Sequence, residues 1–158
     1  MRDLRKTADR YQGFNLLVGD RESLFYFSSR IGEILAVPPG VHALSNHTLN
    51  EPWPKVENAK SALGAALRAE MAWEARQMAI YDFLSSVSRP VDSALPDTGV
   101  GLEWERVLSP ALIVTDAYGT RCSTVLAVDA GRHLQFTEYT RDRTGSVTSQ
   151  ASFTADLR

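Results

Sequence analysis

The segment 118–125 contains the side chains best suited to chemistry, because it places the guanidinium of Arg121 among several hydroxyl groups. The apolar run 126–128 follows directly and predicts a buried strand. A guanidinium that leaves water needs an anion or several hydrogen bonds. Arg121 is therefore expected either to lie on the surface or to bind a negatively charged group. The hydroxyls belong to Thr120, Ser123 and Thr124.

The single cysteine of the chain, Cys122, falls inside this strand pattern and is expected to be buried. No histidine lies near it in the sequence to lower the pKa of its thiol, so we expect it to pack as a small hydrophobic residue and not to act as a nucleophile. The three histidines do not cluster, which argues against a metal site, and no cofactor is predicted.

Composition limits the class of protein. A chain of 158 residues with 44% hydrophobic residues suits one globular domain, 1–158. A net charge of −2 gives no basic surface for nucleic acid. No apolar run approaches the roughly 18 residues needed to cross a bilayer, and the first residues lack a secretory hydrophobic region. We therefore expect a cytoplasmic protein with no membrane span and no nucleic-acid partner.

The hydrophobic pattern changes type along the chain and predicts an α+β fold of antiparallel sheets with two central helices. The run 24–27 is continuously apolar, which suits a strand covered on both faces. Residues 2–10 are compatible with a helix, 19–23 with a turn, and 89–99 with a loop. Strands are predicted over 14–20, 24–29, 41–46, 111–115, 123–128, 134–140 and 146–153. Helices are predicted over 59–71 and 73–87. Pro54 is suited to the first turn of a helix.

Four segments, in this order, carry a resemblance to a known family: 11–20; 44–46 with 51–56; 95–99 with Glu105 and 108–109; and 118–121 with 123–125. Together they resemble the NRDE-type proteins, the family of transport and Golgi organisation protein 2. The match spans almost the whole chain, and the order of the segments is more specific than any one of them.

The resemblance implies a fold similar to the N-terminal-nucleophile hydrolases, in which two antiparallel sheets are layered between helices as an αββα sandwich. In those enzymes an N-terminal cysteine attacks an amide carbonyl while its own α-amino group acts as base. This chain begins Met1-Arg2 and has no Asn-Arg-Asp-Glu segment. It resembles the C-terminal portion of an NRDE-type domain, and residues 1–158 alone are expected to be inactive as an amide hydrolase.

Two site residues follow from the same resemblance, Asn46 and Arg121. A side-chain amide at the polar end of the strand 41–46 would stabilise developing negative charge on a carbonyl oxygen without transferring a proton. Arg121 would lower the pKa of the attacking thiol or hold an acidic group. Structural alternatives remain open: Asn46 would cap a turn. Arg121 would be exposed, or paired with Glu138, Glu103 or Asp116.

The resemblance also allows a non-enzymatic role in binding or trafficking a small-molecule ligand, either haem or an acyl-CoA or lipid. No Cys-Pro pair or cluster of His and Met gives positive support to haem. A third interpretation is an incomplete chain. Part of an interleaved two-sheet fold would leave sheet edges and apolar faces uncovered, which predicts self-association or a complementing chain that supplies the N-terminal portion.

Overall fold

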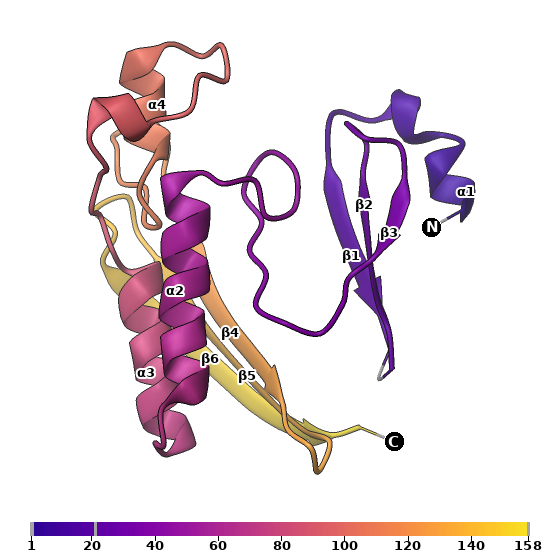
Figure 1. The fold of residues 1–158 in the computed structure, drawn as a ribbon. Coiled ribbons are helices and arrows are strands. Elements are labelled where there is room, and N and C mark those ends of the chain that lie inside the picture. Colours follow the sequence, from indigo (N-terminus) through magenta and orange to yellow (C-terminus); the bar gives the residue numbers. More distant parts are fainter. Residues whose placement is uncertain (1, 21, 158) are drawn as a thin grey trace. The chain divides into compact units, whose positions relative to one another are not determined.

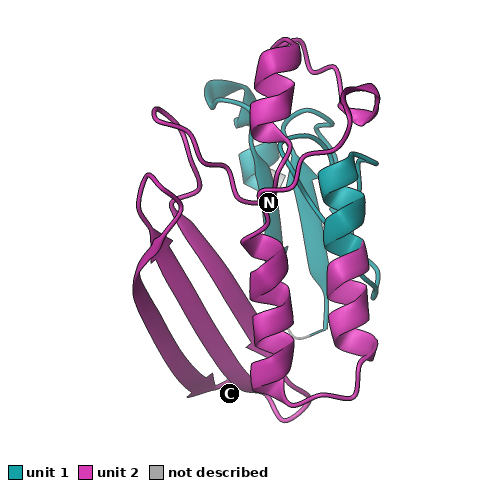
Figure 2. Ribbon diagram, turned by 90° about the vertical axis from the view of Figure 1, so that its left-hand side faces the viewer, with its two compact units in different colours: residues 1–60 teal, residues 61–158 magenta. Residues whose placement is uncertain are grey.

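The computed structural model describes residues 2–20 and 22–157, which divide into two compact units, Met1–Lys60 and Ser61–Arg158 (Figure 2). Each unit contains one three-stranded antiparallel sheet, and helices precede the first sheet and lie between the two sheets along the chain. The predicted α+β class is therefore confirmed.

The first unit is built on the predicted strands 14–20 and 24–29, which form a hairpin across the predicted turn. Strand β1 (Asn15–Gly19) pairs antiparallel with β2 (Leu24–Ser28), and β3 (Ile34–Ala36) pairs with the other edge of β2 (Figure 1). Between β1 and β2, the carboxylate of Asp20 accepts backbone hydrogen bonds from Glu22 and Ser23. The expected turn 19–23 includes Arg21, which lies outside the described residues.

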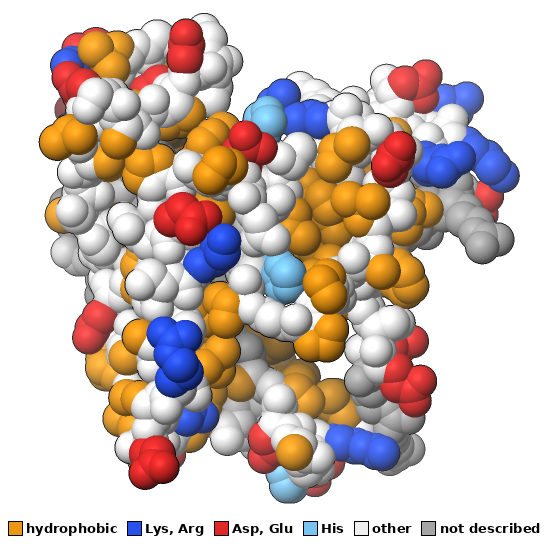
Figure 3. Space-filling model, viewed as in Figure 1, with side chains coloured by type: hydrophobic (Ala, Val, Ile, Leu, Met, Phe, Trp, Pro, Cys, Tyr) orange, Lys and Arg blue, Asp and Glu red, His pale blue; other side chains and the backbone are white. Residues whose placement is uncertain are grey.

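Burial along β2 matches the prediction only in part. Tyr26 and Phe27 are 0% and 1% exposed, and adjacent strand residues point to opposite faces, so this end of the strand is covered on both sides. Leu24 and Phe25 are exposed. In Figure 3, hydrophobic side chains gather over the β1–β2–β3 sheet, which is consistent with the exposure of Val18, Phe25 and Leu35.

The predicted strand 41–46 is wrong, because this stretch forms an irregular loop and the third strand is β3 instead. The last ladder bond runs from the Val37 amide to the Leu24 carbonyl, and the following Pro38-Pro39 has no backbone N–H to continue the ladder. Beyond the prolines, Ala43 uses both backbone groups in bonds to Asn50, which replace strand pairing.

The N-terminal helix is shorter than predicted. A helix over 2–10 was expected, and the structure has α1 (Arg2–Arg5) followed by the 3₁₀ turn η1 (Ala8–Arg10). The hydroxyl of Thr7 bonds back to the Leu4 carbonyl at 3.3 Å, at the point where the α-helix has ended. Such side-chain bonds to the backbone compete with helix continuation.

Both predicted central helices are present. Helix α2 (Pro54–Arg68) begins at its proline, and α3 (Trp73–Leu84) follows after a short loop; α2 starts in the first unit and ends in the second. In the second unit, Arg76 Nε donates to the Ala66 carbonyl at 3.0 Å and Nη2 to the Ala69 carbonyl at 3.3 Å. Because the last carbonyls of a helix have no partner within it, Arg76 ties α3 to the end of α2.

The second sheet has the order β4-β5-β6, with β4 at Cys122–Val128, β5 at His133–Arg141 and β6 at Val147–Asp156 (Figure 1). Helix α3 packs against it, and the rings of Tyr81 and Tyr139 lie 4.2 Å apart. Strand β4 is buried only at alternate residues, with Leu126 and Val128 exposed. The run 126–128 therefore does not form a fully buried strand, because only one face of this sheet is covered by α3.

Three short elements of the second unit differ from the prediction. The expected strand 111–115 is reduced to one bridge between Val114 and Gly119. The loop 89–99 contains the 3₁₀ turn η2 (Asp92–Ala94), and a helix α4 (Leu102–Leu108) follows it. Arg106 joins these two elements through an ion pair with Asp92 at 2.6 Å. Across the part of the chain that the structure describes, no helix combines the length and the apolar character that crossing a bilayer would require.

Candidate functional site

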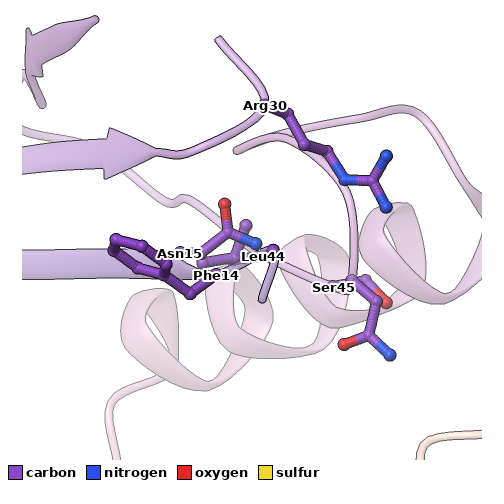
Figure 4. A pocket seen from close by; sticks show the side chains of 7 residues that line it. Phe14, Asn15, Arg30, Leu44 and Ser45 are labelled. Atoms are coloured by element: carbon purple, nitrogen blue, oxygen red, sulfur yellow. The ribbon is translucent and has the colours of Figure 1, made fainter. Parts of the chain in front are cut away.

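A cavity of about 610 Å³ lies in the first unit and includes Asn46, one of the two residues predicted for the site (Figure 4). Three segments form its wall: the start of β1, the turn after β2, and the loop that precedes α2. The lining residues are Gly13, Phe14, Asn15, Arg30, Leu44, Ser45 and Asn46.

The first two segments are joined by hydrogen bonds just beyond the strand ends. The Phe14 amide donates to Ser29 Oγ at 2.9 Å, and the Ser29 amide donates to the Phe14 carbonyl at 3.0 Å. These bonds extend the β1–β2 pairing by one step and fix the position of the next residue, Arg30. In Figure 4 the Arg30 side chain extends over the segment that carries Ser45, whereas the Phe14 ring points away from it.

The third segment is held to the sheet by a buried tyrosine. Tyr26 donates its hydroxyl proton to Asn15 Oδ1 at 2.7 Å and accepts the Leu49 amide at 3.2 Å. The Asn15 amide in turn donates to the His47 carbonyl at 2.9 Å. The carboxamide of Asn15 is thus used in fixing the loop, although Asn15 lines the cavity.

Side chains inside the loop stabilise its own conformation. Thr48 Oγ1 donates to Glu51 Oε2 at 2.6 Å, and His47 Nδ1 lies 2.9 Å from the same oxygen. The hydrogen bonds from Thr48 and His47 lower the pKa of the Glu51 carboxyl below its ordinary value, and the bond from Thr48 has the larger effect. The His47 ring also lies 5.4 Å from the Trp53 ring, just before α2 begins.

Asn50 closes the loop on its other side. It adopts a left-handed backbone conformation with φ of 61°, which asparagine tolerates, and its Oδ1 accepts the Ala43 amide at 3.1 Å. Its Nδ2 lies 2.8 Å from His42 Nδ1, so this histidine nitrogen accepts. His42 Nε2 therefore carries a proton and donates to the Pro38 carbonyl at 2.9 Å. Together these contacts fix residues 44–46 at the edge of the cavity.

Three side chains of the cavity offer hydrogen-bond donors that no described residue uses. Arg30 and Asn46 are exposed and Ser45 is half-buried, and none of these side chains has a hydrogen bond or ion pair with the described residues. No Asp or Glu is among the lining residues. A guanidinium and a carboxamide in this setting suit a carbonyl oxygen, a carboxylate or a phosphate. Asn46 occupies a bend and not the end of a strand, which corrects the predicted placement.

Sequence reasoning did not single out Arg30. The residue follows Ser28-Ser29 at the end of an apolar strand, a position at which surface arginines are common. The β1–β2 pairing, extended by the bonds between Phe14 and Ser29, brings it to the segment 13–15, which belongs to the family resemblance. The signal in the sequence was therefore the predicted β1–β2 hairpin, since its register places the two ends together.

Arg121 belongs to the second unit and lies directly before β4. Its side chain is exposed and forms no hydrogen bond or ion pair with any residue that the structure describes, so the alternative pairings with Glu138, Glu103 and Asp116 are absent there. Only its backbone is engaged, because its carbonyl accepts the Arg141 amide at 2.8 Å. The guanidinium is therefore available to an external anion.

The hydroxyl groups around Arg121 in the sequence are not gathered around its guanidinium. Each is bonded to another partner: Thr120 Oγ1 accepts the Ile113 amide, Ser123 Oγ accepts Arg141 Nε, and Thr124 donates to Glu138. Cys122 is exposed, which corrects the expectation that it is buried, because it begins β4 on the face that α3 does not cover. Within residues 2–20 and 22–157, no group of three or more His, Cys, Asp or Glu could hold a metal ion.

The fold and the cavity define an α+β protein with a small cationic pocket in its N-terminal unit. A family model described as Transport and Golgi organisation 2 matches residues 1–143, and the chain belongs to this family. Its relatives include the Transport and Golgi organization protein 2 homolog of Bos taurus, 32% identical over 144 residues, and that of Homo sapiens, 29% identical over 142 residues. The Transport and Golgi organization 2 homolog of Mus musculus is 28% identical over 141 residues.

Each of these matches covers 81% of this chain and 50% of the relative. The chain therefore spans about half the length of the curated relatives that it matches. The family resemblance predicted from the four sequence segments is confirmed.

Proposed function

We propose that this chain is a ligand-binding member of its family, whose N-terminal unit holds a small molecule through an electron-rich oxygen. The observation that carries the proposal is the carboxamide of Asn46, which lines the cavity without a hydrogen-bond partner among the described residues. The described side chains that line the cavity include donors but neither a thiol nor a general base. Such a wall binds an oxygen more readily than it attacks a carbonyl.

Between the two ligand classes suggested by the resemblance, the cavity favours an acyl-CoA or lipid over haem. An acyl-CoA or phospholipid carries phosphate and carbonyl oxygens that match the donors of Arg30 and Asn46. Haem also has carboxylates, but its iron takes an axial ligand from His, Cys, Met or Tyr. Within residues 2–20 and 22–157, none of these residue types lines the cavity.

Calorimetric titration of the purified chain with palmitoyl-CoA and, separately, with haem tests this proposal. We expect binding of palmitoyl-CoA, weakened about 5- to 30-fold by Asn46→Ala, because one hydrogen bond contributes about 1–2 kcal/mol. Asn58→Ala, an exposed residue of α2 that does not line the cavity, is the matched control and should bind as the wild type does. An absence of heat with both ligands would contradict the binding function.

A second candidate function is amide hydrolysis of the N-terminal-nucleophile type, which would require a nucleophile supplied from outside residues 1–158. Asn46 would donate to the oxygen of the tetrahedral intermediate, and Arg121 would lower the thiol pKa or hold an acidic group of the substrate. This candidate is favoured by the exposed guanidinium of Arg121, which has no acidic partner among the described residues. We expect no release of amine by residues 1–158, whose only thiol is Cys122. Turnover by this chain would contradict the assigned roles.

Self-association is a further part of the proposal, and we place the interface between two copies at the exposed edge of β6. This strand pairs with β5 along one edge, every residue of it is exposed, and its only charged residue is Asp156. Natural edge strands are usually protected by charges or prolines, which β6 otherwise lacks. A second copy paired antiparallel about Ala151 and Ser152 would place Asp156 opposite Val147, so that no like charges meet.

A further inference from the structure

We infer that Arg30 forms an anion subsite in the cavity of the first unit, so that the ligand carries a carboxylate or phosphate within reach of the oxygen bound by Asn46. This inference rests on the proposed binding function. It specifies in addition that the ligand is negatively charged. It concerns one residue, Arg30, that neither the sequence pattern nor the family resemblance singled out.

The first reason is the charge of the wall. Among the residues that the structure describes, Arg30 is the only charged one in the wall, since the others are glycine, phenylalanine, leucine, serine and asparagine. The nearest acidic residue along the chain, Glu33, forms no ion pair with Arg30. Glu51, in the loop that forms one wall, is engaged by Thr48 and His47. The guanidinium is therefore not neutralised by these neighbours.

The second reason is that the backbone under Arg30 is fixed. The amides of Ile31 and Gly32 both donate to the Ser28 carbonyl, at 3.2 and 2.9 Å, and the Arg30 amide lies 3.3 Å from Ser28 Oγ. Ser28 is fully buried, and Gly32 has a φ of 72°, a conformation that glycine adopts without strain. This tight turn sets the direction in which the side chain leaves the sheet.

The third reason is the geometry of the two donors. A guanidinium presents parallel N–H groups that match two oxygens of a carboxylate or phosphate. A carboxamide presents one N–H₂ group, which suits a single carbonyl or phosphoryl oxygen. With Arg30 and Asn46 on the same wall, the cavity recognises a ligand that has an anionic group and a neutral or esterified oxygen close together.

Three probes with ten carbon atoms each separate the charge from the apolar part of the ligand: decyl phosphate, decanoate and the neutral decanamide. We expect Arg30→Gln to weaken binding of the two anions about 10- to 100-fold, the range for a charged bidentate contact, and to leave decanamide within about twofold. The affinity of Arg30→Lys for the two anions should lie between that of the wild type and that of Arg30→Gln, because lysine keeps the positive charge but lacks the planar guanidinium. Asn46→Ala should weaken all three probes.

Arg143→Gln provides the matched control, since it removes an exposed arginine of the other unit. Thermal unfolding of every variant checks that the fold is kept. Inorganic phosphate alone, added as a fourth probe, shows whether the headgroup is sufficient or a lipid-like chain is needed. Anion binding should also weaken with added salt, whereas decanamide binding should not.

The outcomes separate the inference from the proposed function. Equal binding of anions and decanamide, with no effect of Arg30→Gln, would overturn the anion subsite and leave the binding function intact. Failure of the wild type to bind any probe would overturn both. Preferential binding of anions that is lost in Arg30→Gln and kept in Arg143→Gln is the result that the structure leads us to expect.

Discussion

Replacement of Arg141 should destabilise the second unit, and lysine should be a worse replacement than methionine. Arg141 is 4% exposed, and no carboxylate among the described residues pairs with it. Its guanidinium instead donates to Ser123 Oγ at 3.1 Å, to the Gly145 carbonyl at 2.8 Å and to Ser85 Oγ at 2.7 Å. It also lies 5.2 Å from the centre of the Tyr81 ring.

The magnitude follows from which groups lose their partners. Arg141→Lys keeps a buried charge but loses at least two of three charge-assisted hydrogen bonds, each contributing about 1.5–3 kcal/mol, so we expect a loss of about 3–6 kcal/mol. Arg141→Met leaves one carbonyl and two rotatable hydroxyls without a donor and loses the contact with Tyr81. It also removes the cost of burying a charge, so the net loss should be about 1–3 kcal/mol.

Urea unfolding followed by far-UV circular dichroism measures both changes. The Lys variant should approach complete loss of the second unit's fold if the wild-type stability lies at the low end, about 5 kcal/mol, of the usual range. Arg143→Lys, an exposed neighbour, should change the stability by less than about 0.5 kcal/mol. If lysine were tolerated better than methionine, the hydrogen-bond geometry would not be what holds Arg141, and the reasoning would be refuted.

Two further predictions concern the loop and the exposed strand edge. Because hydrogen bonds lower the folded-state pKa of Glu51, its contribution to stability should be complete above the ordinary value of 4.5 and decline as the pH falls through the lower folded value. The difference in melting temperature between the wild type and Glu51→Gln should therefore shrink in acid; a constant difference from pH 3 to 7 would contradict it. Ala151→Lys, a charge on the edge of β6, should shift the mass measured by light scattering from dimer to monomer. A wild-type chain that stays monomeric at every concentration would refute pairing through β6.

Much of the fold could be predicted because its signals are local. The hairpins β1–β2, β4–β5 and β5–β6 follow from apolar strand patterns separated by turn residues, and the α2–α3 pair follows from helical spacing. The failures occurred where local signals are weak. The stretch 41–46 has strand-like composition, but the Ala43 amide donates to Asn50 Oδ1 and the Ala43 carbonyl accepts the Asn50 amide, in place of strand pairing.

Of the two donors in the candidate site, Asn46 could be predicted from the sequence and Arg30 could not. Asn46 was reached through the family resemblance, and its place in a cavity depends on the loop held by Tyr26 and Glu51. Arg30 carried no signal of its own, because an exposed arginine after a strand has many structural explanations. The exposure of Cys122 was likewise missed, since strand periodicity does not state which face of a sheet a helix covers.

The α+β class, most of the strands, the helix pair and the family could be predicted from the chain alone, because these features depend on residue order and on periodicities read over a few turns. The tertiary structure alone decided that Arg30 and Asn46 share a cavity and that the buried guanidinium of the second unit is Arg141. The physical reason is that both facts depend on contacts between segments distant in sequence. Such contacts are set by packing and hydrogen bonding across the fold, and no local pattern records them.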